Sequence, residues 1–213
     1  MRRFIFFFVV FSLFAPVGQA GIILGNLPAS NDNAGTDFLT IQYKAMGFQM
    51  GAAAANLESV TFRYEMLEIN RANFIGGSMY IYSDLAGLPG SSLAFIPTAF
   101  ILADGTFEVT FSPILPFTLA ANTAYWLVLN GQPVSTQGPL PFRWLASSPG
   151  ITPAGPLATH TGGYTSTDGI NWNNSTILNS YQLNGTVPEP GTVWLGGLAL
   201  ASLAGRFRRR AQR

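Results

Sequence analysis

Apolar and polar residues alternate with a period of two along several short stretches of the chain. In residues 59–67, Val60, Phe62, Tyr64 and Met66 fall on one face and the polar residues between them on the other. This alternation is typical of a strand with one buried side and one side in water. Similar patterns predict further strands at residues 38–50, 78–84, 106–114, 123–131, 141–148 and 176–187.

Residues 123–131 are apolar almost throughout, which predicts a central strand covered on both faces. Residues 51–58 could form one helical turn, a loop or the approach to a strand. Clusters of Gly, Pro, Asn and Asp separate the strands, and Asp104-Gly105 is a candidate tight turn. The pattern predicts an all-β fold over residues 21–186, an antiparallel β-sandwich of jelly-roll type, with a barrel as the alternative.

The N-terminal end has the three parts of a signal peptide. Arg2 and Arg3 precede an apolar run over residues 4–14, and small residues follow at Gly18 and Ala20. We expect residues 1–20 to be removed by cleavage between Ala20 and Gly21. The alternative, an N-terminal membrane anchor, is disfavoured because a span needs about 20 apolar residues.

The C-terminal end also has three parts, here over residues 187–213. The motif Val187, Pro188, Glu189 and Pro190 precedes an apolar segment, residues 191–205, and the basic residues Arg206, Arg208, Arg209 and Arg210. As a helix the apolar segment would be about 22 Å long, short of a hydrocarbon core of about 30 Å. Because arginine side chains can snorkel and act as a stop-transfer signal, we still predict a short transmembrane helix, with residues 21–186 outside the membrane.

This order of Pro-Glu-Pro, apolar segment and arginines resembles the PEP-CTERM sorting signal of Gram-negative bacteria. The resemblance implies that an exosortase-like enzyme recognises Pro188, Glu189 and Pro190 and processes the protein. It implies an inner membrane-anchored intermediate that faces the periplasm, followed by release to the cell envelope or the extracellular space. The Sec translocon and signal peptidase are the partners expected at the other end of the chain. A plain C-terminal anchor is the alternative.

A second resemblance covers most of residues 38–148. The stretches "MYIYSDLAGLPGSSLA" and "FTLAANTAYWLVL" are similar to a domain of the choice-of-anchor class, which is attached to varied surface-anchoring tails. That class has no settled biochemical activity, so the resemblance implies fold and context alone.

Charge and composition exclude several functions. Residues 21–186 contain nine acidic and four basic residues, which gives no basic surface for a nucleic acid to follow. The absence of cysteine excludes disulfides and thiolate chemistry. The only histidine, His160, lies in a Gly-rich stretch expected to be an exposed loop, and no G-x-S-x-G motif is present. We therefore predict no catalytic residue and no metal site.

Two kinds of ligand remain open. Residues 30–37 and 166–174 are rich in side-chain oxygens that suit a structural calcium ion, although turns use the same residues, so no cofactor is expected otherwise. The aromatic residues Tyr164 and Trp172, both expected in loops, could contact sugar rings. The favoured function is a non-enzymatic envelope or extracellular-matrix protein associated with biofilms. The alternatives are a carbohydrate-binding module attached to exopolysaccharide and, third, a secreted glycoside hydrolase with paired carboxylates.

Overall fold

The computed structural model describes residues 21–38, 42–66, 78–99, 103, 105–131 and 142–188. These residues form β-strands and connecting segments, and none of them is helical. The strands are β1 (Gly21–Gly25), β2 (Ala34–Phe38), β3 (Tyr43–Met50), β4 (Ala55–Met66), β5 (Ser78–Leu85), β6 (Leu88–Pro97), β7 (Thr106–Phe111), β8 (Phe117–Leu119), β9 (Ala124–Asn130), β10 (Phe142–Ala146), β11 (Ala158–Ser166), β12 (Asn173–Asn174) and β13 (Tyr181–Thr186).

The first sheet is built around the long strand β4, and its strands run in the order β1-β13-β4-β10-β2. Along one side of β4, β13 pairs with residues 56–62 and β10 with residues 64–66. Along the other side, β8 pairs with residues 55–57 and β7 with residues 60–65. The alternation predicted for β4 is confirmed, since Val60, Phe62, Tyr64 and Met66 are all buried.

The second sheet has the order β12-β11-β3-β9-β5-β6, and all its pairings are antiparallel. Strand β9 lies inside this sheet, as its apolar sequence predicted. Its residues Leu127 and Leu129 belong to the main core, whereas Trp126 and Val128 belong to a second cluster on the opposite face. This sheet therefore buries apolar side chains on both faces.

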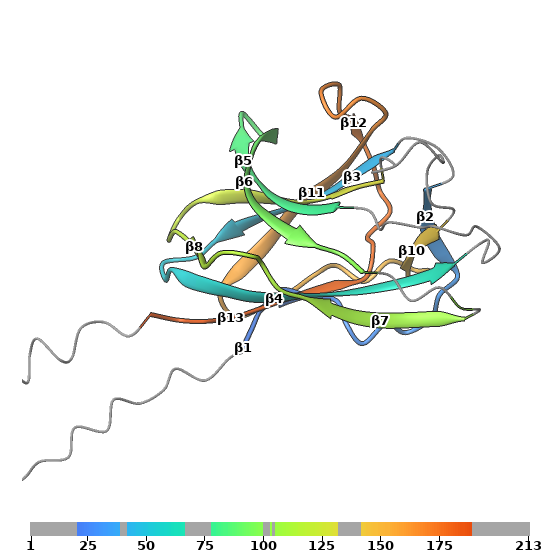
Figure 1. Cartoon of the computed structure of the whole chain (residues 1–213), viewed down its shortest axis with the longest axis horizontal. Helices are drawn as coiled ribbons and strands as arrows, with labels where there is room; N and C mark the ends of the chain where they lie inside the picture. The colour runs from blue at the N-terminus through green and yellow to red at the C-terminus, as the bar shows by residue number, and fades with distance from the viewer. Residues whose placement is uncertain are drawn as a thin grey trace, which may run out of the picture.

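The main core lies between the two sheets, which Figure 1 shows as two layers. Phe48 and Ile81 from the second sheet and Phe62 and Trp144 from the first have no exposed surface. The rings of Phe62 and Trp144 lie 5.1 Å apart. Burial of this kind is the main stabilising contribution in a chain without disulfides. The predicted antiparallel β-sandwich is confirmed.

Each predicted strand overlaps an observed one: β3, β4, β5, β7, β9, β10 and β13. The sequence pattern missed β1, β2, β6, β8, β11 and β12. The prediction that residues around His160 form a loop is wrong, because residues 158–166 pair with β3 along its whole length. Residues 51–54 form a loop and β4 starts at Ala55, so the helical turn considered there is excluded. Asp104 lies outside the described residues, while its neighbour Gly105 has a φ of 121°.

The hairpin between β5 and β6 offers a test of turn chemistry. Ala86 and Gly87 connect the strands with φ values of 53° and 83°, and Leu85 pairs with Leu88. Two positive φ values are the mark of a type I′ turn, which favours Asn-Gly. Because alanine is strained there, we expect Ala86→Asn to raise the free energy of unfolding by about 0.5–1 kcal/mol in chemical denaturation. Gly87→Ala is the control and should lower the free energy of unfolding. If neither variant changed the free energy of unfolding, the turn assignment would be wrong.

Candidate functional site

The outer face of the second sheet carries a cluster of aromatic side chains. Tyr43 and Trp126 are buried there around Ala45 and Val128, and Tyr82, Tyr164 and Trp172 pack against them. The ring centroids of Trp126 and Tyr164 are 5.3 Å apart, and those of Tyr43 and Trp172 are 6.3 Å apart, both pairs in edge-on geometry. The outer face of a sandwich sheet is ordinarily polar. An aromatic outer face therefore points to a binding surface.

A glycine on β3 allows Trp126 to lie close to the sheet. Gly47 pairs with Trp126 on one side and with Gly162 on the other. A Cβ atom at Gly47 would lie 2.5 Å from Cζ3 of Trp126 and 2.6 Å from Oγ1 of Thr161. The register of β11 shifts between His160 and Gly162, which leaves Thr161 as the extra residue of a bulge. Bulges are common beside binding sites because they redirect one side chain.

Two projections flank this face, the β5–β6 hairpin and the segment joining β11 to β12, and Figure 1 shows both rising from the same side of the molecule. Two cavities of about 270 and 410 Å³ lie between them. The smaller is lined by Asp84, Gly87, Ala124, Trp126, Thr161, Gly162, Tyr164 and Asn174. The larger is lined by Ser83, Leu85, Pro89, Gly90, Ser91, Gly169 and Ile170. We call this region the aromatic cleft; its cavities have about the size of small-ligand sites.

Asp84 is the acidic side chain in the smaller cavity, and two donors hold it. Nε1 of Trp126 donates to Oδ1 of Asp84 at 2.9 Å, and the backbone N–H of Gly87 donates to Oδ2 at 3.0 Å. A carboxylate oxygen has two lone pairs, so each oxygen can accept one more hydrogen bond. The hairpin turn and the tryptophan therefore position an acceptor at the edge of the cleft.

Of the two segments considered for calcium, residues 166–174 contain the turn between β11 and β12, and this turn satisfies its own carboxylate. Oδ1 of Asp168 accepts from the backbone N–H groups of Ile170 and Asn171, each at 2.8 Å, and from Oγ of Ser166 at 2.9 Å. Oδ2 accepts from Nδ2 of Asn171 at 2.6 Å. These hydrogen bonds hold the pKa of Asp168 well below its usual range, and the two from backbone N–H groups have the largest effect. The arrangement is that of a turn stabilised by its aspartate.

The acids of residues 30–37 form ion pairs with arginine. Arg63 donates to Asp32 at 2.6 Å and to Glu108 at 2.7 Å, and Arg143 pairs with Asp37. In the part of the chain that the structure describes, no three His, Cys, Asp or Glu side chains gather in a way that could hold a metal ion. The carboxylates of these two segments are thus engaged by arginine or by donors of their own turn.

The structure brings together the two residues singled out for sugar contact. Tyr164 and Trp172 pack against the same cluster on the outer face. The expectation that Tyr164 lies in a loop is wrong, because it belongs to β11; Trp172 does lie between strands. Sequence reasoning missed Tyr43, Trp126 and Asp84 as members of the site. The signal for Trp126 was the apolar character of its whole strand. Such a strand buries alternate residues on each face, so the sequence indicated a second, outer cluster that includes Trp126.

His160 does not belong to the cleft. It pairs with Phe48, whose side chain is in the main core, and it is half-buried rather than exposed. Neither ring nitrogen has a hydrogen-bond partner among the described residues. Burial lowers the pKa of His160, which favours the neutral imidazole. This position is unsuited to a general base that must reach a substrate in solution.

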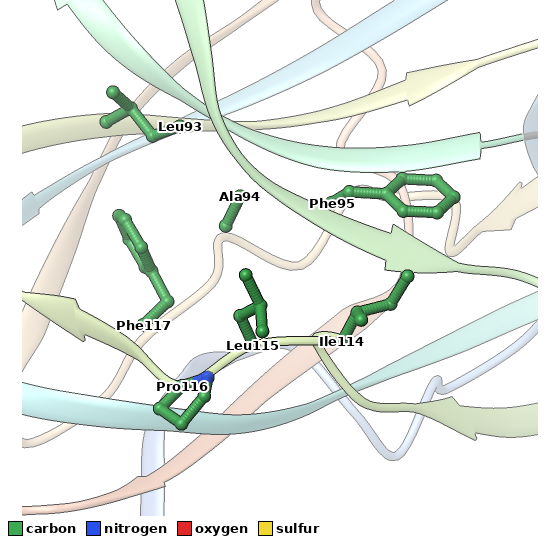
Figure 2. Close-up of a pocket in the computed structure, with 7 residues that line it drawn as sticks. All are labelled: Leu93, Ala94, Phe95, Ile114, Leu115, Pro116 and Phe117. Carbon is green, nitrogen blue, oxygen red and sulfur yellow. The ribbon is translucent and has the colours of Figure 1, made fainter.

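A separate apolar groove lies where β6 faces the segment before β8. Figure 2 shows Ile114, Leu115 and Phe117 pointing toward β6, and the backbone N–H of Ile114 donates to the carbonyl oxygen of Phe95 at 3.3 Å. The groove has a volume of about 290 Å³, and Leu115 is 73% exposed. Its lining residues are Leu93, Ala94, Phe95, Ile114, Leu115, Pro116 and Phe117. No side chain in this lining carries a polar group, so it offers no directional recognition.

The chain ends of the sandwich lie beside each other. Gly21, the residue after the predicted cleavage point at Ala20, pairs with Gly185 of β13. Val187 and Pro188 follow β13 and are exposed. The described residues include neither the predicted signal peptide nor most of the C-terminal signal. The parts of that signal outside them are Glu189, Pro190, the apolar segment, Arg206, Arg208, Arg209 and Arg210. The described residues contain no helix that is long and apolar enough to cross a membrane.

Comparison with known proteins identifies the C-terminal segment. No curated protein matches the chain. Residues 186–210 match the family model described as the PEP-CTERM protein-sorting motif. The match begins at the last residue of β13 and includes the Pro-Glu-Pro sequence and the four arginines. The chain therefore carries a PEP-CTERM sorting motif directly after its β-sandwich, which supports its export and its processing as an exosortase substrate.

Proposed function

We propose that this protein is a non-enzymatic component of the cell envelope or of the extracellular matrix of a biofilm. The sorting motif at residues 186–210 is the observation that carries the proposal. The motif starts where the sandwich ends, so the folded domain is the part that sorting delivers. The resemblance of residues 38–148 to choice-of-anchor domains agrees with this role.

The arrangement of ionisable groups supports a non-enzymatic role. Glycoside hydrolysis needs two carboxyl groups facing each other across a substrate. Here Asp32 and Glu108 share Arg63, Asp37 pairs with Arg143, and Asp168 accepts from its own turn. Asp84 lines the smaller cavity without a second carboxyl group in that lining. The third candidate, a hydrolase, is therefore disfavoured, and turnover of a polysaccharide that one carboxylate substitution abolishes would revive it.

The proposed route uses both ends of the chain. The Sec translocon would export the protein, and signal peptidase would cleave between Ala20 and Gly21. The apolar segment 191–205 would hold the intermediate in the inner membrane, with its arginines on the cytoplasmic side. Pro188 and Pro190 disfavour helix, so Glu189 would be presented on an extended peptide to an exosortase-like enzyme.

Substitution of the sorting motif tests the proposal. We expect the intact mass of wild-type protein from cells to show trimming at both ends. Glu189→Ala should keep residues 191–213 and stay in the membrane fraction, because the extended peptide loses its acidic group. Glu58→Ala, an exposed acid of β4, is the matched control and should be trimmed normally. Normal trimming of Glu189→Ala, or full-length wild-type protein in the cytosol, would contradict the proposal.

A second candidate function, attachment to exopolysaccharide, is favoured by the aromatic cleft. Tyr164 and Trp172 lie together on a surface that also holds a positioned carboxylate. Binding of polysaccharide would explain how a processed protein without its anchor is retained at the cell surface. The two candidates are compatible, since a matrix protein can be non-enzymatic and bind glycan.

A further inference from the structure

We infer that the aromatic cleft binds a neutral polysaccharide, with a sugar ring packed on the half-buried Tyr164, which the buried Trp126 contacts edge-on, and with sugar hydroxyls bonded to Asp84, Thr161 and Asn174. The inference rests on the proposed delivery of the domain to the envelope, and it gives the cleft a ligand class and a set of contact residues.

The aromatic side chains supply the surface for sugar rings. One face of a pyranose ring carries C–H groups with partial positive charge, and the face of an aromatic ring carries partial negative charge. Trp126 and Tyr164 line the smaller cavity together, and Tyr82 and Trp172 extend the same cluster. The missing Cβ of Gly47 lets Trp126 lie against the backbone, and the hydrogen bond from its Nε1 to Asp84 orients the indole at the floor of the cavity.

Phenol groups gather beside this floor. Burial raises the pKa of Tyr43 and of Tyr82, and the nearby Tyr80 raises both further. The ring centroids of Tyr80 and Tyr82 lie 6.0 Å apart, and Tyr82 packs against the cluster that contains Tyr43. Tyrosine is frequent in recognition surfaces because it combines an apolar ring with a hydrogen-bonding tip at low entropic cost.

The edge of the smaller cavity supplies polar groups for sugar hydroxyls. Within the described part of the chain, the side chains of Thr161 and Asn174 make no hydrogen bond, so both are available to a ligand. Asp84 is already oriented by Trp126 and Gly87 and keeps a free lone pair on each oxygen. A carboxylate held in this way can accept from two neighbouring hydroxyls of one sugar, and hydrogen bonds to a charged acceptor are the strong ones.

The charge around the cleft selects a neutral ligand. Asp84 lines it and Asp168 lies in the turn beside it, so both nearby charges are negative. Lys44 cannot offset them, because its side chain is buried, with its amine bonded to Ser175 and Ile177. An acidic polymer would therefore be repelled. A proline-rich peptide also suits tyrosine-lined grooves, but the carboxylate, hydroxyl and amide at this edge fit a ligand with many hydroxyls better.

Affinity electrophoresis of the purified full chain, kept in a detergent without a sugar head group, tests the inference. The neutral probes are dextran, mannan and a soluble β-1,4-glucan, and the acidic probe is alginate. We expect at least one neutral polymer to retard wild-type protein, independently of salt, and alginate to leave its migration unchanged. Tyr164→Ala should weaken the retardation about tenfold or more, and Asp84→Asn and Asn174→Ala severalfold.

Leu115→Ala is the matched control, because Leu115 is exposed in the separate apolar groove; it should bind like wild type. Thermal unfolding separates loss of binding from loss of fold, and Asn174→Ala, at an exposed position, keeps the test valid if Tyr164→Ala is unstable. Three results would overturn the inference: no binding to any neutral probe, preference for alginate, or binding of a proline-rich peptide at the cleft in place of sugars. Normal sorting of a protein that binds no glycan would overturn this inference alone, whereas glycan binding by an unsorted protein would overturn the proposed function alone.

Discussion

The free energy of unfolding of wild-type protein is expected to rise between pH 7 and pH 10, and Lys44→Met is expected to abolish most of this rise. Lys44 lies in β3 and has no exposed surface. Its Nζ donates to Oγ of Ser175 at 2.6 Å and to the carbonyl oxygen of Ile177 at 3.0 Å. Burial lowers the pKa of Lys44 from 10.5 to about 7. A neutral amine has two N–H groups, and these two acceptors satisfy both.

The sign of the effect follows from proton binding. Between pH 7 and 10.5 the unfolded chain holds a proton on Lys44 that the folded chain has lost. Stability therefore increases with pH over this window, by up to about 1.4 kcal/mol per pH unit. Below pH 7 both states are protonated, and the folded protein carries the full cost of a buried ammonium group. The total gain in the free energy of unfolding from pH 7 to 10.5 is several kcal/mol, a large share of the roughly 5–15 kcal/mol that stabilises a typical domain.

Chemical denaturation at a series of pH values measures this effect directly. Lys44 is the only lysine of the chain, and the chain has no cysteine. The tyrosines, whose ordinary pKa is about 10, titrate at the upper end of this window, and because Lys44→Met keeps all of them, the difference between the two proteins isolates Lys44. Lys44→Arg is the companion variant. It should be destabilised at every pH, because arginine stays protonated. An equal pH dependence in wild type and Lys44→Met would show that Lys44 is not the responsible group.

Asn179→Ala is expected to lower the free energy of unfolding by about 3 kcal/mol, since it leaves two buried polar groups without partners. Asn179 has no exposed surface and lies where β10 and β13 meet along β4. Its Nδ2 donates to the carbonyl oxygen of Trp144 at 2.6 Å, and its Oδ1 accepts from Oγ1 of Thr36 at 3.1 Å. Asn26 reinforces the junction by donating to the carbonyl oxygen of Asn179 at 3.2 Å.

Asn173→Ala is the control for this variant, because Asn173 is exposed on the edge strand β12 and its substitution should change stability by less than about 0.5 kcal/mol. Urea denaturation of the two variants gives the comparison. A loss below about 1 kcal/mol in Asn179→Ala would mean that water replaces the amide at the junction.

The strands that were predicted are those whose pattern is local. β4 and β7 alternate because each has one face in the core, and β9 is apolar throughout because both its faces are covered. β11 was missed because Gly162 and Gly163 resemble a loop in sequence; its strand conformation comes from pairing with β3. The extra residue Thr161 also interrupts the period of two on which the prediction depends.

The residue pattern along the chain was sufficient for the sandwich class and for the sorting motif, because alternation acts over neighbouring residues and a sorting enzyme meets its motif as a linear peptide. The partners of the charged and polar groups were settled only by folding. Arg63 of β4 meets Glu108 on the neighbouring strand β7 and Asp32 in the segment between β1 and β2. Lys44 becomes buried, and Trp126 donates a hydrogen bond to Asp84. Such contacts join segments far apart in the chain, and no local pattern specifies which segments come together.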